Sequence, residues 1–158
     1  MGHEFRIIET PGHTLDHIAF YNMQANVLFC GDTLFSAGCG RLFEGTYDQL
    51  HGSIQKINQL PDETKIYCGH EYTVSNLQFA ASVEKNNKII QKRLNTAKQS
   101  RKQNLPTVPA TLKIEKQTNP FLRCEEKSVI DAAILREGKK LTNSIEVFAT
   151  IRRWKDSF

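Results

Sequence analysis

Three short segments of this sequence pair a glycine with a histidine or an aspartate, and both side chains can bind metal ions. The segments are residues 10–14 (TPGHT), 30–35 (CGDTLF) and 67–72 (YCGHEY). A glycine directly before His13, Asp32 and His70 would let the backbone turn tightly and direct each side chain. Imidazole nitrogens and carboxylate oxygens are both ligands for zinc and similar cations. The pattern therefore predicts a metal site built from His13, Asp32 and His70.

A simpler interpretation of the same three pairs exists. Any single Gly-His or Gly-Asp pair is more often a turn that carries a solvated polar residue. Here each pair follows a strand-like run, and loops after strands are where layered α/β folds bind ligands. Composition and spacing alone leave both interpretations open. The other histidines of the chain interior, His17 and His51, are expected to be surface or packing residues.

The elements that would position these residues are short strands. Four apolar runs predict buried strands, and they cover Phe5–Glu9, His17–Tyr21, Asn26–Cys30 and Thr64–Cys68. A helix is expected between the last two strands, because Thr46 and Gln49 form a capping-box pattern. Apolar residues then recur at helical spacing up to Ile57, and Pro61 follows.

The second half of the sequence is predicted to be helical. The expected helices are Val74–Val83, Lys88–Arg101, Glu125–Arg136 and Ser144–Lys155. Leu105–Phe121 contains prolines and is expected to be a connection. The change from short strand-like runs to helical patterns after His70 predicts two domains, residues 1–72 and residues 73–158.

Composition restricts the class of protein. Hydrophobic residues make up 39% of the chain and charged residues 24%, as in an ordinary globular protein. No run is long enough to span a membrane, and the four cysteines form no Cys-x-x-Cys pair, so free thiols in the cytoplasm are expected. The net charge of +4 is too modest to indicate nucleic acid. Residues 85–104 hold seven Lys or Arg, which would suit either a solvated helix or an anion-binding face.

The three motifs together resemble the later metal-ligand motifs of the metallo-β-lactamase superfamily. The longer run of residues 32–45 (DTLFSAGCGRLFEG) is similar to the glyoxalase II branch, the hydroxyacylglutathione hydrolases. Residues 119–123 (NPFLR) and 151–156 (IRRWKD) extend that resemblance over nearly the whole chain. It implies an α/β (α+β) fold: the second part of an αββα sandwich, followed by a small helical substrate-binding domain.

The resemblance also implies an activity and its cofactors. Hydroxyacylglutathione hydrolases cleave glutathione thioesters, typically S-lactoylglutathione, to glutathione and a hydroxy acid in methylglyoxal detoxification. They use two divalent metal ions, usually zinc and sometimes iron or manganese. By this resemblance His13 would bind the first ion, His70 the second, and Asp32 would bridge both. Asp32 is accordingly the predicted catalytic residue.

The same resemblance implies a glutathione-binding set. Its expected members are Arg41, Phe43, Tyr72, Arg152 and Lys155. Some relatives have a tyrosine where Phe43 stands, so a hydrogen bond from that position would be lost here. Arg152 and Lys155 lie three residues apart and would share one face of a helix. Without the resemblance, two cations in a last helical turn would be explained by the helix dipole.

The superfamily motif Thr-His-x-His-x-Asp-His does not occur in these 158 residues, which contain no His-x-His at all. That motif supplies the other metal ligands, so we expect weak metal binding and negligible hydrolysis from this chain alone. The alternative function is a non-catalytic fragment that binds glutathione or associates with another chain through an exposed sheet.

Overall fold

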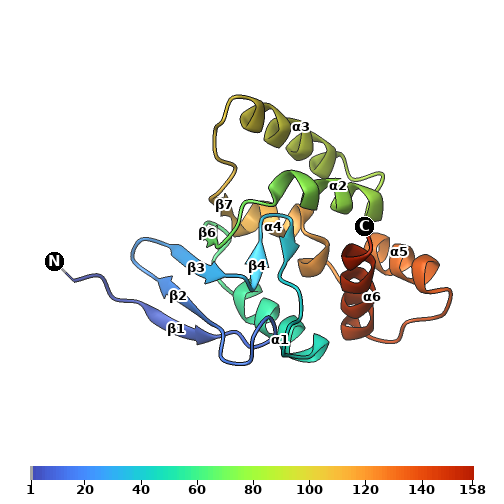
Figure 1. Cartoon of the computed structure of the whole chain (residues 1–158), viewed down its shortest axis with the longest axis horizontal. Coiled ribbons are helices and arrows are strands. Elements are labelled where there is room, and N and C mark those ends of the chain that lie inside the picture. Colours follow the sequence, from blue (N-terminus) through green and yellow to red (C-terminus); the bar gives the residue numbers. More distant parts are fainter. Residues whose placement is uncertain (1) are drawn as a thin grey trace.

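The computed structural model describes residues 2–158 and combines a five-stranded sheet with a set of helices (Figure 1). The strand order is β1-β2-β3-β6-β7. These strands are β1 (Arg6–Glu9), β2 (Ile18–Asn22), β3 (Val27–Gly31), β6 (Lys65–Cys68) and β7 (Ala110–Thr111). β3 and β6 run parallel, and the other neighbours run antiparallel. The four strands expected from the sequence are confirmed, and most of their ends differ from the predicted ones by one residue.

Helix α1 (Tyr47–Asn58) covers one face of this sheet. Its predicted capping box is present, because Thr46 and Gln49 exchange hydrogen bonds between side chain and backbone. Leu50, Ile54 and Ile57 are fully buried against the inward residues of the strands. Alternation along each strand explains this packing, since every second side chain points toward the helix.

Four longer helices follow, as the sequence predicts. They are α2 (Thr73–Val83), α3 (Lys88–Lys102), α5 (Lys127–Glu137) and α6 (Ser144–Asp156). In Figure 1, α2 and α3 lie above the sheet, while α5 and α6 lie on the side away from β1. No helix within residues 2–158 is long and apolar enough to cross a membrane.

The expectation of a simple connection over Leu105–Phe121 is wrong. That segment contains β7, helix α4 (Leu112–Thr118) and the start of a 3-10 helix, η1 (Pro120–Leu122). Thr111 caps α4 through its hydroxyl, and Leu112 is fully buried. Tertiary packing therefore stabilises a helix that the local sequence signals only weakly.

A small hairpin lies outside the main sheet. It consists of β4 (Leu34–Phe35) and β5 (Gly38–Cys39), and its turn residue Ala37 has a positive φ of 57°. Strands of two residues are too short to show a hydrophobic period, so no sequence pattern predicts them.

A single hydrophobic core joins the sheet to the helices. Ile8, Leu28 and Ile66 of the sheet belong to the same cluster as Phe121 and Phe148 of the helical region. A second cluster lies mainly between α2 and α3. The predicted division into residues 1–72 and 73–158 stays a prediction.

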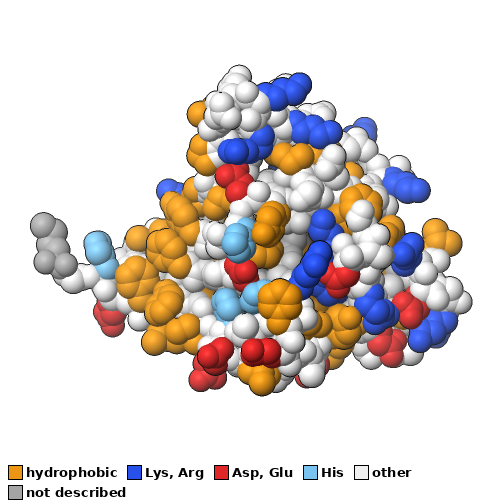
Figure 2. Space-filling view, viewed as in Figure 1, with side chains coloured by type: hydrophobic (Ala, Val, Ile, Leu, Met, Phe, Trp, Pro, Cys, Tyr) orange, Lys and Arg blue, Asp and Glu red, His pale blue; other side chains and the backbone are white. Residues whose placement is uncertain are grey.

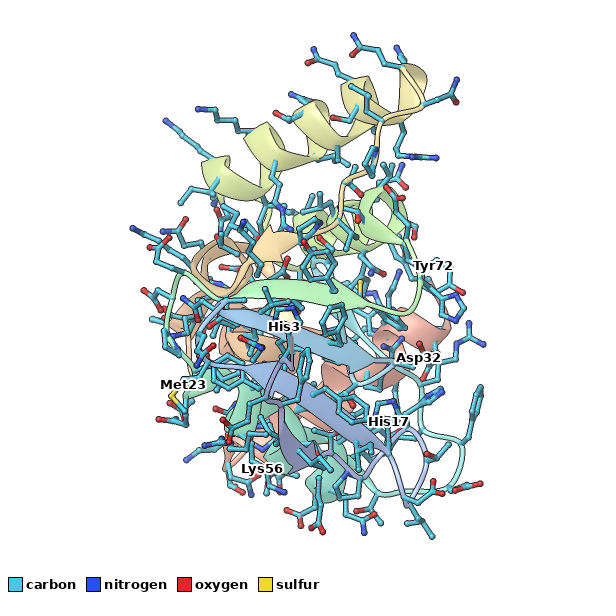
Figure 3. All side chains as sticks on the ribbon, turned by 90° about the vertical axis from the view of Figure 1, so that its left-hand side faces the viewer. His3, His17, Met23, Asp32, Lys56 and Tyr72 are labelled. Atoms are coloured by element: carbon cyan, nitrogen blue, oxygen red, sulfur yellow. The ribbon has the colours of Figure 1, made fainter. Side chains whose placement is uncertain are left out.

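The other face of the sheet is apolar and exposed. Ile7, Phe20, Phe29 and Tyr67 pair with one another across four neighbouring strands. Ile7 is 59% exposed, and Phe29 is 44% exposed although it stacks on Tyr67. Figure 2 shows hydrophobic side chains gathered over β1, β2 and β3, and in Figure 3 these strands face the viewer.

The burial of His51 predicts a pH dependence of stability. Burial lowers the pKa of His51 below its usual 6.5, and the ring packs edge-on against Phe148. The unfolded chain therefore takes up a proton more readily than the folded chain, so stability falls as pH drops below about 6.5. In urea unfolding from about pH 7.5 to about pH 5, the free energy of unfolding should fall less for His51→Leu than for the wild type. Parallel profiles for the two proteins would contradict this account.

Candidate metal centre

The topology of the sheet brings the three predicted metal ligands together. β3 and β6 are parallel neighbours, so the loops that follow them lie at the same edge of the sheet. Asp32 follows β3, His70 follows β6, and His13 lies in the loop between β1 and β2. Figure 3 shows Asp32, His17 and Tyr72 at this edge, with Met23 at the opposite one.

The geometry centres on one oxygen of Asp32. Its Oδ2 atom lies 3.5 Å from Nε2 of His13 and 3.3 Å from Nε2 of His70. Nδ1 of His13 lies 2.8 Å from the carbonyl oxygen of Arg41. A carbonyl only accepts hydrogen bonds, so Nδ1 carries a proton, and in the neutral ring the lone pair on Nε2 is the one available to a metal ion. Such a backbone acceptor is the usual support of a metal-binding imidazole.

This donor set fits a divalent cation only in part. Across residues 2–158, no group of three or more His, Cys, Asp or Glu side chains is arranged to hold a metal ion by itself. Two cations that shared Asp32 would each receive two ligands, whereas zinc sites in proteins hold four. The three side chains therefore have the ligand chemistry of a metal centre, but fewer ligands than a closed site needs.

His17 supports the loop that carries Asp32, a role that the sequence did not reveal. Its Nε2 accepts a hydrogen bond from the backbone N–H of Asp32 at 3.2 Å. Its Nδ1 lies within 3.0 Å of the hydroxyls of Thr10 and Thr33. Burial lowers the pKa of His17, and the neighbouring His13 lowers it further. The neutral ring therefore fits this position, because Nε2 must remain an acceptor.

All three glycines before the candidate ligands are required by geometry. At Gly12 the φ is +146°, and a Cβ there would lie 2.6 Å from Cα of Leu50. Gly31 has a φ of +48°, and a Cβ there would lie 2.8 Å from Nε2 of His17. Gly69 needs no left-handed backbone, but a Cβ there would collide with the carboxylate of Asp32. The predicted tight turn is thus confirmed at Gly31, and close approach of a side chain explains Gly69.

One cavity of about 670 Å³ brings together every residue that the sequence singled out. The candidate metal ligands lie at one end, and α6 forms part of the wall. Figure 2 shows histidine side chains around an acidic one near the middle of this face, with basic side chains beside them. The predicted set that lines the cavity is His13, Asp32, Arg41, Phe43, His70, Tyr72, Arg152 and Lys155.

Two arginines of the cavity wall are held by one carboxylate. Asp156 lies 3.0 Å from Nη2 of Arg152 and 3.6 Å from Nε of Arg41. Arg152 is almost fully buried, and its Nη1 donates to the carbonyl of Cys39 at 2.9 Å. Arg41 remains largely exposed. The proposed contact of Arg152 with a substrate stays a prediction, since its guanidinium already has internal partners.

Lys155 and the aromatic residues complete the wall. Nζ of Lys155 lies 5.3 Å from the ring centre of Phe79, and burial together with Arg152 and Arg41 lowers the pKa of Lys155. Tyr72 stacks on His70, and Phe43 packs against His13 at 4.7 Å between ring centres. Burial raises the pKa of the nearby Cys39 thiol to about 11, so this thiol is no nucleophile at neutral pH.

Comparison with known families divides the chain into two matched segments. Residues 71–158 match the family described as hydroxyacylglutathione hydrolase C-terminus. Residues 1–70 match the metallo-beta-lactamase superfamily. Both matches agree with the resemblance drawn from the motifs.

Individual relatives are similar over the full chain. It is 48% identical to a hydroxyacylglutathione hydrolase of Nitrosomonas eutropha, with 98% of this chain and 60% of that protein covered. It is 51% identical to one of Pseudomonas savastanoi pv. phaseolicola, with 100% and 62% covered. The chain thus spans about 60% of the length of these relatives.

Solved structures are similar in fold. The BLEG-1 B3 metallo-beta-lactamase superposes with a TM-score of 0.51 at 27% identity, over 76% of this chain and 42% of that one. TTHA1623, solved in a di-iron-bound form, gives a TM-score of 0.50 at 27% identity, over 75% and 42%. The expected fold, the second part of a metallo-β-lactamase sandwich followed by a helical region, is therefore shown.

The geometry around Asp32 predicts which side chain matters most for metal binding. Asp32→Ala should weaken Zn²⁺ binding by well over about tenfold, since even the supporting partners of metal ligands are worth that much. His13→Ala and His70→Ala should each lower the affinity for Zn²⁺ less than Asp32→Ala does, because each ring would serve only one ion in the predicted site. Isothermal titration calorimetry can compare these variants with Asp131→Ala, which removes an exposed carboxylate distant from the cavity. Equal Zn²⁺ binding by Asp32→Ala and Asp131→Ala would refute the metal role.

Proposed function

This chain belongs to the hydroxyacylglutathione hydrolase family of the metallo-β-lactamase superfamily, and from that premise we propose that it takes part in hydrolysing S-(hydroxyacyl)glutathione thioesters. The products would be glutathione and a hydroxy acid, with S-lactoylglutathione as the typical substrate. The observation that carries the proposal is one cavity in which Asp32 faces two histidines and three cations line the wall. The superfamily implies divalent metal ions.

His13 and His70 would each hold one of two such ions, most simply zinc, and Asp32 would serve both. Bound divalent cations supply Lewis acidity and a hydroxide nucleophile at neutral pH. The di-iron form of TTHA1623 supports a binuclear site in this fold. Zinc, iron and manganese all accept this set of nitrogen and oxygen ligands.

The residues of this chain would contribute orientation and charge. Arg41 fixes the tautomer of His13 through its carbonyl, and His17 holds the backbone of Asp32. The carboxylate of Asp32, placed between two cations, would offset their mutual repulsion. In the wall, Lys155 and the exposed side chain of Arg41 would attract the carboxylates of glutathione.

Aromatic residues would bind the less polar parts of the substrate. Tyr72 and Phe43 lie on opposite sides of the candidate centre, against His70 and His13 respectively. Both are exposed to the cavity, at 48% and 71%. Phe43 offers surface and no hydroxyl, so only Tyr72 of this pair could donate a hydrogen bond to the substrate.

Further metal ligands would have to come from outside residues 1–158. The greater length of the relatives leaves room for such a segment. The exposed sheet face formed by Ile7, Phe20, Phe29 and Tyr67 supports a second candidate function, association with another polypeptide segment. The four cysteines are free thiols, which agrees with our proposal of a cytoplasmic protein.

We expect the 158-residue chain alone to hydrolyse S-lactoylglutathione negligibly, even with added zinc, iron or manganese. Co-expression with the N-terminal segment of the Nitrosomonas eutropha relative should create activity, because the segment would supply the remaining ligands. That activity should be lost in Asp32→Ala and retained in Asp131→Ala. The activity of the chain alone and that of the co-expressed enzymes can both be measured by the loss of thioester absorbance in the ultraviolet. A turnover of about 10 per second from the chain alone, typical of enzymes, would show that further ligands are unnecessary.

Lys155 offers the cleanest test of substrate binding. In the co-expressed enzyme, Lys155→Ala should raise KM by roughly ten- to a hundred-fold with little change in kcat, as for loss of one charged hydrogen bond. Arg153→Ala is the matched control, since Arg153 lies on the same helix but pairs with Glu137. Steady-state kinetics at low and high salt should show the Lys155 effect shrinking with salt. A collapsed kcat with unchanged KM would reject the binding role.

A further inference from the structure

The hairpin β4–β5 is held by side chains of the helical region. Asn119 donates its amide to the carbonyls of Phe35 and Gly38, at 3.2 and 3.0 Å. Asn76 donates to the carbonyl of Ser36 at 3.0 Å. A buried backbone group needs such a partner, and a two-residue strand cannot provide partners for all of its groups. The position of the hairpin therefore depends on residues far away in the sequence.

Glu115 is the centre of this arrangement. Its side chain is fully buried, and its two oxygens have different partners. Oε2 accepts the backbone N–H of Ala37 at 2.8 Å and the amide of Asn119 at 3.2 Å. Oε1 accepts the hydroxyl of Ser36 at 3.3 Å and pairs with the guanidinium of Arg93.

This pairing corrects one expectation about the basic segment. Arg93 lies within residues 85–104, but its side chain is only 12% exposed and also donates to Thr118 and Ser36. It therefore belongs neither to a solvated face nor to an anion-binding one. A carboxylate buried without a partner would be costly, and removal of either member of such a pair leaves an uncompensated charge.

The hairpin and the residues on either side of it are connected to all three candidate metal ligands. Asp32 lies two residues before its first residue, Leu34, and the ring of Phe35 lies 6.0 Å from that of His70. After the hairpin, the N–H of Gly40 donates to the carbonyl of Thr33, and the carbonyl of Arg41 accepts the Nδ1 proton of His13. A displacement of the hairpin would thus reach His13, Asp32 and His70 together.

We propose that Glu115, with Arg93 and Asn119, is a positioning group that sets the tautomer of His13 and the spacing of the three ligands through the hairpin. The inference rests on the proposed function only in taking these three residues as the metal ligands. A group that merely stabilised the fold would lower the unfolding free energy without changing the site of the folded molecules. The two roles therefore predict different results.

The test compares two neutralised carboxylates in the metal-free chain. Glu115→Gln keeps the shape but loses the charge, and it places an N–H₂ group where donors already point. Glu84→Gln is the matched control, because Glu84 is also buried and bound to an arginine and a serine, Arg123 and Ser128. Imidazole nitrogen NMR reports the tautomer of His13 directly. We expect one Nδ1–H tautomer in the wild type and in Glu84→Gln, and a mixture in Glu115→Gln.

Zn²⁺ titration of the same proteins gives a second measurement. Glu115→Gln should bind Zn²⁺ at least about tenfold more weakly than Glu84→Gln, the usual effect of removing a supporting partner. If Glu115→Gln does not fold, Arg93→Lys retains the charge and should shift the His13 signals in the same direction but less far.

An unchanged His13 tautomer in the folded variant, Glu115→Gln or failing that Arg93→Lys, would overturn the positioning role. So would equal shifts in Glu84→Gln. Neither result would count against the proposed hydrolysis, since no turnover is measured in this experiment. Loss of hydrolysis in the co-expressed enzyme, with the His13 signals as expected, would count against the proposed function alone.

Discussion

The backbone of the hairpin β4–β5 cannot satisfy its own hydrogen bonds, and the rest of the site is arranged around this constraint. Its carbonyls and its turn N–H are bound by side chains from α2, α4, α6 and the start of η1. These bonds connect the helical region to the loop that carries Asp32. The geometry of the candidate metal centre therefore depends on the helices, although its candidate ligands all precede α2.

The pairing of the strands also determines where the candidate ligands lie. Parallel pairing of β3 and β6 places Asp32 and His70 at one edge, and the loop before β2 adds His13. Because β1, β2 and β3 pair antiparallel, His17 at the start of β2 comes back toward Gly31 at the end of β3. The ring of His17 then accepts a hydrogen bond from the backbone N–H of Asp32.

Much of this could be predicted from the sequence because the signals were local. Apolar runs indicated the strands, the pair Thr46 and Gln49 indicated the start of α1, and the motifs around His13, Asp32 and His70 indicated the site. Helix α4 was missed because its sequence, LKIEKQT, has few apolar residues and follows two prolines. Its stability comes from buried contacts of Leu112 and Glu115, which no window of sequence contains.

The hydrogen-bonding roles of His17 and Arg93 are not predictable from the sequence, for the same physical reason. A histidine at a strand start and an arginine in a basic helix have no local feature that separates a solvated side chain from a buried one. Their partners, Thr33 for His17 and Glu115 for Arg93, lie 16 and 22 residues away. Only the folded chain brings these groups together, so spacing rules could not find them.

The cations of the cavity wall illustrate how one helix serves two purposes. Arg152 of α6 is buried over the ring of Phe121, and it binds the carbonyl of Cys39 and the carboxylate of Asp156. Lys155, one turn later, lies at the cavity, and burial and its basic neighbours lower its pKa. A buried arginine that is bound to the hairpin can fix the distance between α6 and the metal centre. The lysine beside it keeps the excess positive charge that an anionic substrate requires.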